Sequence, residues 1–283
     1  MSLLVTGHEG FIGSALMKFF KNKGYFVYGM EKSYLKDKNY STWQKNLLEY
    51  LEIIKPDCVF HVGACADTQN YDVNYMMKYN AECTMLISNW CKAKEIPMIY
   101  SSSAACYGVD GEPNTIYSWS KYLGEQTVIA NKQIALRYFN VYGFDERHKG
   151  KMASVAYQSY LKHSKGEVVK LFPSEPKRDF VYIKDVLNAN YLALLNYNEN
   201  RGNFFDVGTG NARKFEDVLN IIGVPYKYTS INEIPSGYQF NTKSSKNKFL
   251  KGWKPYYSLE EGLDTYVREL SSFSNNKYIQ SSL

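Results

Sequence analysis

A tyrosine and a lysine four residues apart, Tyr117 and Lys121, form the first pair in this sequence that could perform chemistry. On a helix, residues i and i+4 share one face, so the ammonium would lie near both the phenol and a bound ribose. The positive charge should favour the phenolate and lower the tyrosine pKa from its usual value of about 10. A tyrosine tuned in this way can act as a general base toward an alcohol. The same spacing occurs at two other tyrosines, so only its context gives it meaning.

A serine-rich run ahead of Tyr117 supplies that context. It reads YSSSAACYG over residues 100–108 and overlaps the end of an apolar stretch at 96–101. If this stretch is a strand of a parallel sheet, a hydroxyl at its carboxyl end faces the crevice where such sheets bind ligands. Ser103 is therefore the candidate hydroxyl partner of Tyr117. Turn formation by the serines is the alternative interpretation.

Three glycines near the N-terminus, Gly7, Gly10 and Gly13, have the spacing of a phosphate-binding turn. They follow an apolar stretch at 2–6 and open a helical pattern from about residue 11. The first glycine would make the tight turn, the second would let the backbone approach a pyrophosphate, and the third would let helix and strand pack closely. The helix N-terminus, with Phe11 and Ile12, would present N–H groups to the anion. We expect a dinucleotide here, with an ordinary glycine turn as the plainer alternative.

An acidic residue about 20 positions after such a turn accepts hydrogen bonds from the cofactor's ribose. Glu31 occupies that place, at the end of the apolar stretch 25–30. Its carboxylate would repel a 2′-phosphate and so favours NAD. Lys32 follows at once and could neutralise that phosphate, so the residues leave both NAD and NADP open.

Short apolar runs alternate with helical periodicity through the first half of the chain. Strands are predicted at 2–6, 25–30, 58–63, 96–101 and 133–138, and helices from about 11, near 72–93 and from about 116. This alternation predicts an α/β fold with a Rossmann-type, doubly wound parallel sheet. We expect residues 1–140 to form a dinucleotide-binding domain, completed by a strand near 203–207. Residues 141–283 should form a smaller, interleaved and largely substrate-binding lobe.

The composition argues against several classes of protein. The net charge is +6, but no nucleic-acid-binding module accompanies it, so we expect no nucleic-acid partner. The lysines between 243 and 254 form either a solvated face or an attraction for an anionic substrate. No apolar run approaches the roughly 20 residues of a membrane span, and no signal peptide is recognisable, so we expect a cytoplasmic protein without a membrane partner. The five cysteines lack metal-ligand spacing, so reduced thiols and no metal site are expected.

Taken together, the GHEGFIG run from Gly7, the serine run and the Tyr117/Lys121 pair resemble the extended short-chain dehydrogenase/reductase family of sugar-nucleotide epimerases and dehydratases. The resemblance covers about residues 1–270. It implies that Ser103, Tyr117 and Lys121 are the catalytic trio. It also implies a tightly bound nicotinamide cofactor bordered by Val62, Gly63, Ala64, Asn80 and Val141. Members of this family range from dimers upward, so a homo-oligomer is expected.

Further runs are similar to one branch of that family, the ADP-heptose 6-epimerases. These runs are RYFNVYG from 137, ERHKGKMASVA from 146, KLF from 170, KRDFVY from 177, HVGAC from 61 and YQ from 238. The likeness implies that Lys149, by itself only a loop lysine, is a second acid/base. It implies that the nucleotide sugar is held by Ser103, Asn140, Phe172, Arg178 and Tyr238. The implied substrate is ADP-heptose, oxidised at C6 and reduced again on its other face.

Three departures from that branch fall on substrate contacts. Lys151 stands where the branch has a serine, Gly237 where it has an arginine, and the loop before Tyr117 is short. A 4-epimerase or ketoreductase acting on another nucleotide sugar is therefore an alternative, as is a non-catalytic dinucleotide-binding protein. Dehydration is disfavoured, because the Asp-Glu pair that dehydratases carry after the hydroxyl residue is Ala104-Ala105 here, and methyl groups cannot move protons.

Overall fold

The computed structural model describes residues 1–31, 40–234 and 239–280 of the chain. The chain divides into two compact units, and each unit is built from several stretches of sequence. The first unit comprises Met1–Tyr138, Leu187–Val207 and Asn247–Trp253. The second comprises Phe139–Val186, Gly208–Lys246 and Lys254–Leu283. Each unit is described by itself below.

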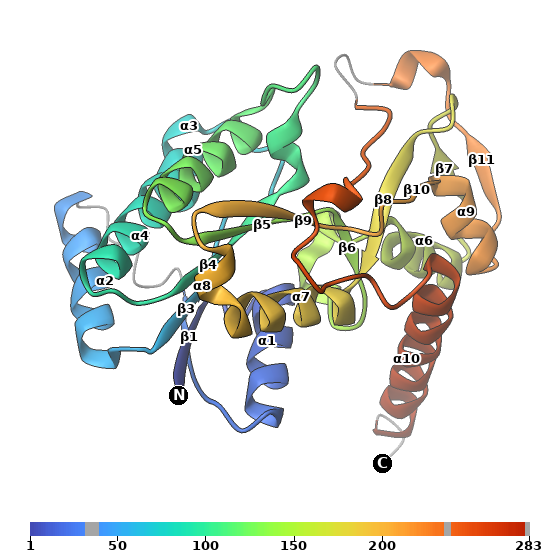
Figure 1. The fold of residues 1–283 in the computed structure, drawn as a ribbon. Coiled ribbons are helices and arrows are strands. Elements are labelled where there is room, and N and C mark those ends of the chain that lie inside the picture. The colour runs from blue at the N-terminus through green and yellow to red at the C-terminus, as the bar shows by residue number, and fades with distance from the viewer. Residues whose placement is uncertain (32–39, 235–238, 281–283) are drawn as a thin grey trace. The chain divides into compact units, whose positions relative to one another are not determined.

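A six-stranded parallel sheet forms the centre of the first unit (Figure 1). Its strands are β1 (Ser2–Thr6), β2 (Phe26–Met30), β3 (Cys58–His61), β4 (Met98–Ser103), β5 (Ile134–Tyr138) and β9 (Asn203–Val207). They lie in the order β2-β1-β3-β4-β5-β9, and every neighbouring pair is parallel. The strand order reverses between β1 and β3, where open sheets of this kind bind ligands beyond the carboxyl ends of the strands. The predicted Rossmann-type sheet is confirmed.

Helices cover both faces of this sheet. On one face, α2 (Tyr40–Ile54), α4 (Cys83–Ala93) and α5 (Ile116–Ala130) contribute Trp43, Ile87 and Val128 to a core cluster with Val59. The next strand residue, Phe60, points to the opposite face, because successive side chains alternate along a strand. There its ring lies 4.6 Å from the ring of Phe20 in α1 (Phe11–Asn22), which also meets a ring from α7 (Ile183–Leu195). Burial on both faces is what a parallel sheet requires.

Two features of the first unit differ from the predicted elements. Helix α2 lies where the sequence predicts no element, yet Trp43, Leu47 and Leu51 recur every four residues in it and are completely buried. The helix predicted near 72–93 is three consecutive pieces: α3 (Val73–Met76), a π-helical turn (Met77–Glu82) and α4. Such turns are rare and are frequently found at functional sites.

The second unit contains two small sheets. Strands β10 (Ala212–Lys214), β8 (Lys177–Tyr182) and β6 (Asn140–Tyr142) lie in that order, with β8 antiparallel to β10 and parallel to β6. A parallel pair joins β7 (Val169–Leu171) and β11 (Tyr226–Tyr228). The longer helices of the unit are α6 (Val155–Ser164), α9 (Phe215–Ile221) and α10 (Leu259–Gln280). Tyr142 lies at the centre of its core, with its ring 5.5 Å from that of Tyr182 and 6.3 Å from that of Tyr266.

A completely buried carboxylate, Asp179 in β8, ties two loops of the second unit to the sheet. Its Oδ1 accepts hydrogen bonds from the backbone and hydroxyl of Thr209, at 2.7 and 2.5 Å. Its Oδ2 accepts bonds from the backbone of Gly210 at 2.9 Å and from the backbone and hydroxyl of Ser244 at 3.0 and 2.6 Å. Five donors therefore compensate the desolvation of this charge, as burial of a carboxylate demands.

Among the helices within the described ranges, none combines the length and the apolar character that a membrane crossing requires. Within the described ranges, no group of three or more His, Cys, Asp or Glu residues is arranged to hold a metal ion. All five cysteines are free thiols.

Candidate active site

The glycine turn after β1 has no room for side chains. Gly7 adopts φ +65°, and a Cβ added to it would lie 2.6 Å from the Cα of Gly63. A Cβ on Gly13 would lie 2.0 Å from the carbonyl oxygen of Gly7. Gly10 is the N-cap of α1, whose first turn includes Phe11 and Ile12. A bare helix N-terminus behind a tight turn is a ready-made anion site, so these residues fit the pyrophosphate of a dinucleotide.

Glu31 lies against this turn from the end of β2. Its Oε1 accepts a hydrogen bond from the backbone N–H of Glu9 at 2.7 Å and lies 3.5 Å from Nδ1 of His8. The side chain of Glu31 is 18% exposed, so it is mostly but not completely buried. Lys32, the predicted counter-charge for a 2′-phosphate, lies outside the described residues.

Ser103 and Tyr117 meet at the carboxyl end of β4. Ser103 is the last residue of that strand, and its Oγ accepts a hydrogen bond from the backbone N–H of Ala105 at 3.1 Å. Tyr117 lies in the first turn of α5, which Thr115 caps through the N–H of Ser118 at 3.0 Å. The hydroxyl of Ser103 lies near enough to the phenol of Tyr117 to act on its pKa, which it lowers. The structure therefore brings the two candidate side chains together, and their catalytic role stays a prediction.

The electrostatics of this pair differ from the prediction. Burial raises the pKa of Tyr117 to about 12, although the hydroxyl of Ser103 acts to lower it. Burial also lowers the pKa of Lys121 to about 8. The ammonium of Lys121 lies 4.3 Å from the ring centroid of Tyr100, a cation–π contact. The expectation that Lys121 lowers the pKa of Tyr117 is wrong for the protein by itself, because burial raises that pKa.

Asn80 occupies the π-helical turn and is completely buried. Its amide holds the chain after β3: it accepts a bond from the N–H of Cys65 at 2.7 Å and donates to the carbonyl of Cys65 at 3.0 Å. It also donates to Oγ of Ser120 at 3.0 Å, which donates to the carbonyl of Tyr117 at 2.8 Å. Asn80 therefore links the loop that contains Val62, Gly63 and Ala64 to the helix of Tyr117.

A buried ion pair supports the same strand end, and the sequence analysis did not identify it. Arg137 in β5 donates to both oxygens of Glu125, from Nε at 2.8 Å and from a terminal nitrogen at 2.6 Å. Glu125 also accepts from Oγ of Ser102 at 2.6 Å, one residue before Ser103. No signal in the sequence joins Arg137 to Glu125, because the two residues lie on different elements.

Lys149 belongs to the second unit and is not a solvated loop residue. It lies in a helical turn, Arg147–Met152, with its Nζ 3.5 Å from Oε2 of Glu146. Glu146 is completely buried and also accepts bonds from Ser154 and from the hydroxyl of Tyr266. Burial lowers the pKa of Lys149, against the opposing charge of Glu146. A lysine held in this way is better suited to give up a proton than a surface lysine.

The other predicted substrate residues also lie in the second unit. Asn140 and Val141 are in β6, and Phe172 follows β7 directly. Arg178 lies in β8, half-buried, with its guanidinium 5.7 Å from the ring centroid of Phe215. Tyr238 lies outside the described residues. Ser103, Tyr117 and Lys121 thus belong to the first unit, and Lys149 and the sugar-contacting candidates other than Ser103 belong to the second.

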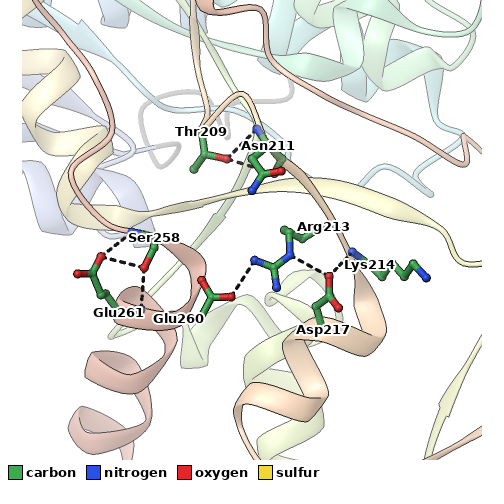
Figure 2. Close-up of polar contacts among 8 residues, drawn as sticks. All are labelled: Thr209, Asn211, Arg213, Lys214, Asp217, Ser258, Glu260 and Glu261. Atoms are coloured by element: carbon green, nitrogen blue, oxygen red, sulfur yellow. Dashed lines mark hydrogen bonds and ion pairs between the residues drawn. The ribbon is translucent and has the colours of Figure 1, made fainter.

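Arg178 faces another arginine across the sheet. Arg213 in β10 is its direct antiparallel partner, and like charges in such a pair repel. Figure 2 shows how the second charge is compensated: Nε of Arg213 lies 2.8 Å from Asp217 and a terminal nitrogen lies 2.8 Å from Glu260. The two carboxylates thereby compensate the charge of Arg213, which weakens its repulsion of Arg178.

The chain is similar to known proteins over most of its length. The model of the NAD dependent epimerase/dehydratase family matches residues 3–208. The chain is 34% identical over 312 residues to an ADP-L-glycero-D-manno-heptose-6-epimerase of Brachyspira hyodysenteriae, covering 95% of this chain and 97% of that protein.

Solved structures give the same result for the fold. The ADP-L-glycero-D-manno-heptose-6-epimerase of Helicobacter pylori superimposes with a TM-score of 0.81 at 27% identity, covering 95% of this chain and 96% of that one. The UDP-glucose 4-epimerase of Thermotoga maritima, solved with UDP-glucose, has a TM-score of 0.80 at 24% identity, covering 96% and 99%. The second likeness concerns the fold alone.

Proposed function

This chain belongs to the NAD-dependent epimerase/dehydratase family, and from that membership we propose that it is a nucleotide-sugar epimerase whose substrate is ADP-glycero-manno-heptose, inverted at C6. The observation that carries the proposal is the proximity of Ser103, at the carboxyl end of β4, to Tyr117, in the same unit as the glycine turn. The choice of sugar rests on the 34% identity to the Brachyspira enzyme over nearly the whole chain.

The residues of the first unit fit a nicotinamide dinucleotide. Gly7, Gly10 and Gly13 would hold its pyrophosphate, and Glu31 would accept hydrogen bonds from its ribose, which favours NAD over NADP. When bound, the nicotinamide supplies a hydride acceptor that can return the hydride. Since the cofactor is regenerated in each turnover, we expect it to stay bound to the protein.

Tyr117 acts as the first acid/base in this proposal. It takes the proton of the sugar hydroxyl, and Ser103 stabilises the phenolate by donating a hydrogen bond. Its pKa of about 12 in the protein alone means that a favourable charge must arrive with the ligands before the phenolate forms at neutral pH. Lys121, with a pKa of about 8, is largely protonated at pH 7 and supplies part of that charge.

Lys149 acts as the second acid/base. An epimerisation by oxidation and reduction places the sugar oxygen in different positions in the two epimers, so one phenol cannot serve both. The lowered pKa of Lys149 makes it a better proton donor to the ketone oxygen than an ordinary lysine. Glu146 holds its ammonium in place and is itself fixed by Ser154 and Tyr266.

The cellular setting of the proposal is cytoplasmic. Five free cysteines fit a reducing compartment. We also expect the chain to form a homo-oligomer, which light scattering on the purified protein tests directly. The substrate is a small nucleotide sugar, and nucleic acid is not an expected partner.

The decisive experiment incubates the purified protein with ADP-D-glycero-D-manno-heptose and no added cofactor. We expect interconversion of the two epimers, measured by NMR or chromatography, without net oxidation or reduction of NAD(P). Tyr117→Phe should abolish it. Stoichiometric consumption of NAD(P)H would instead identify a ketoreductase. Turnover of a UDP-, GDP- or dTDP-sugar without turnover of ADP-heptose would refute the choice of substrate.

A further inference from the structure

His61 has no part in the proposed reaction, yet it lies at the centre of the first unit. It is the last residue of β3 and is 1% exposed. Both ring nitrogens are bonded: Nδ1 lies 2.7 Å from the hydroxyl of Thr6, and Nε2 lies 2.9 Å from the hydroxyl of Thr84. Its ring also stacks on that of Tyr100, with centroids 5.6 Å apart. The imidazole therefore connects the first strand to the helix α4.

The neighbouring groups fix the position of its proton. The hydroxyl of Thr6 accepts hydrogen bonds from the N–H groups of Val62 at 3.1 Å and Gly63 at 2.9 Å. Both lone pairs are then used, so the hydroxyl proton of Thr6 points to Nδ1 of His61. Nε2 therefore carries the ring proton and donates it to Thr84. The imidazole is neutral, because burial and the charge of Lys121 lower its pKa to about 3.

One end of this chain of bonds lies at the cofactor turn. Thr6 directly precedes Gly7, and its hydroxyl holds the N–H of Gly63. Gly63 and Gly7 are packed so closely that a Cβ on either would lie 2.6–3.1 Å from the other's backbone. The hydrogen bond that Thr6 donates to His61 thus fixes the two backbone segments that should contact the dinucleotide.

The other end lies at the catalytic helix. The hydroxyl of Thr84 donates to the carbonyl of Asn80 at 2.6 Å, within the π-helical turn. The side chain of Asn80 donates to Ser120, which donates to the carbonyl of Tyr117. Every link in this path is 3.0 Å or shorter and lies in the first unit.

We propose that His61 is a positioning residue: its Nε2–H tautomer sets the distance between the dinucleotide turn and the helix that carries Tyr117. The inference rests on the proposed function for its catalytic meaning. A neutral imidazole suits this task, because it accepts on one side and donates on the other without placing a second cation beside Lys121. A misplacement of the phenol by about 1 Å can reduce turnover up to about 100-fold.

The first test breaks the path at its middle with Thr84→Val. We expect kcat to fall by about 10- to 100-fold while the affinity for NAD(H) stays within about twofold, because the Thr6 side is untouched. The control is Thr127→Val on α5, whose hydroxyl also donates to a carbonyl four residues earlier, Leu123 at 3.3 Å, but makes no other bond that the structure describes. A lowered melting temperature with unchanged kcat in Thr84→Val would mean a merely structural role and would overturn the proposal.

The second test needs no sugar and no variant. The chain has four histidines, so a spectrum of [15N]histidine-labelled protein is simple to assign. We expect His61 to keep Nε2 protonated and Nδ1 bare from pH 8 to 5. A protonated Nδ1, or titration of His61 in that range, would overturn the proposal.

A third comparison replaces His61 itself. His61→Gln retains a donor toward Thr84, whereas His61→Leu retains neither bond, so glutamine should recover at least part of the lost kcat. Equal kcat in the two variants would contradict the claim that the hydrogen bonds of His61 position the helix of Tyr117. Because the histidine spectrum and the NAD(H) affinity are independent of substrate, they test the network even if ADP-heptose is not turned over.

Discussion

Replacing Glu125 with glutamine keeps the shape of a buried side chain and removes its charge. In the native protein Glu125 is completely buried and the Arg137 side chain is 6% exposed, with two hydrogen bonds of 2.8 and 2.6 Å between them. The variant leaves the guanidinium of Arg137 without its counter-charge, a change that costs about 3–5 kcal/mol in buried pairs. At about 1.4 kcal/mol per factor of ten, the unfolding equilibrium shifts by roughly two to three and a half decades.

The assay is urea unfolding followed by tryptophan fluorescence. All four tryptophans (Trp43, Trp90, Trp119 and Trp253) lie in the first unit, so this signal reports the unit that holds the pair. The matched control is Glu49→Gln, which removes one partner of an exposed pair with Lys45 at 3.6 Å in the same unit. The control should lose less than about 1 kcal/mol. Equal losses in the two variants would refute the claim that burial makes the Glu125 charge indispensable.

The same reasoning can be checked with a double replacement. Glu125→Leu combined with Arg137→Met removes both charges and keeps apolar volume. We expect the double variant to lose less stability than the sum of the two single variants, because neither charge is left unpaired. Additive losses would mean that the two side chains act independently.

Three further outcomes are expected from other positions. Gly13→Ala should abolish dinucleotide binding, measured by calorimetry, because its Cβ would lie 2.0 Å from the carbonyl oxygen of Gly7; retained affinity would contradict the tight turn. Lys149→Ala should lose epimerisation while cofactor reduction by the sugar survives in a single turnover. The control Lys165→Ala, at an exposed lysine, should behave as wild type. Equal activity in both variants would contradict the role of Lys149 as the second acid/base. The pKa of Lys121 falls from 10.5 to about 8 in the folded protein, so the unfolded state binds more protons between these values and stability should rise with pH from about 8 to 10. Lys121→Met should remove that rise of about 3 kcal/mol, measured as the free energy of unfolding at each pH, and an unchanged pH profile would contradict the assigned burial.

Much of the first unit could be predicted from the sequence, because its signals are local. The apolar runs at 2–6 and 96–101 and the turn at Gly7 are consecutive residues, and the parallel sheet follows from their alternation with helices. Helix α2 was missed, although Trp43, Leu47 and Leu51 have helical spacing, because the polar residues around them conceal the stripe in a short window.

What could not be predicted depends on contacts between distant residues. Ser103 and Tyr117 could be identified as partners from their context, but the rise of the tyrosine pKa follows from burial that only the folded protein reveals. The partner of Arg137 lies on another element, and a single sequence gives no sign of which carboxylate it meets. The pairing of His61 with Thr84 is equally invisible before the fold is known. The chemistry of a side chain can be predicted from its residue type, whereas its burial depends on the fold.

The carboxylate of Asp179 has a consequence for how this protein can change. It anchors β8, the residues around Thr209 and those around Ser244 at one point, so a loop of different length at either place would take hydrogen-bond donors away from a buried carboxylate. We therefore expect the ligand preference of this unit to change more readily through side-chain replacements than through changes in the length of these two loops.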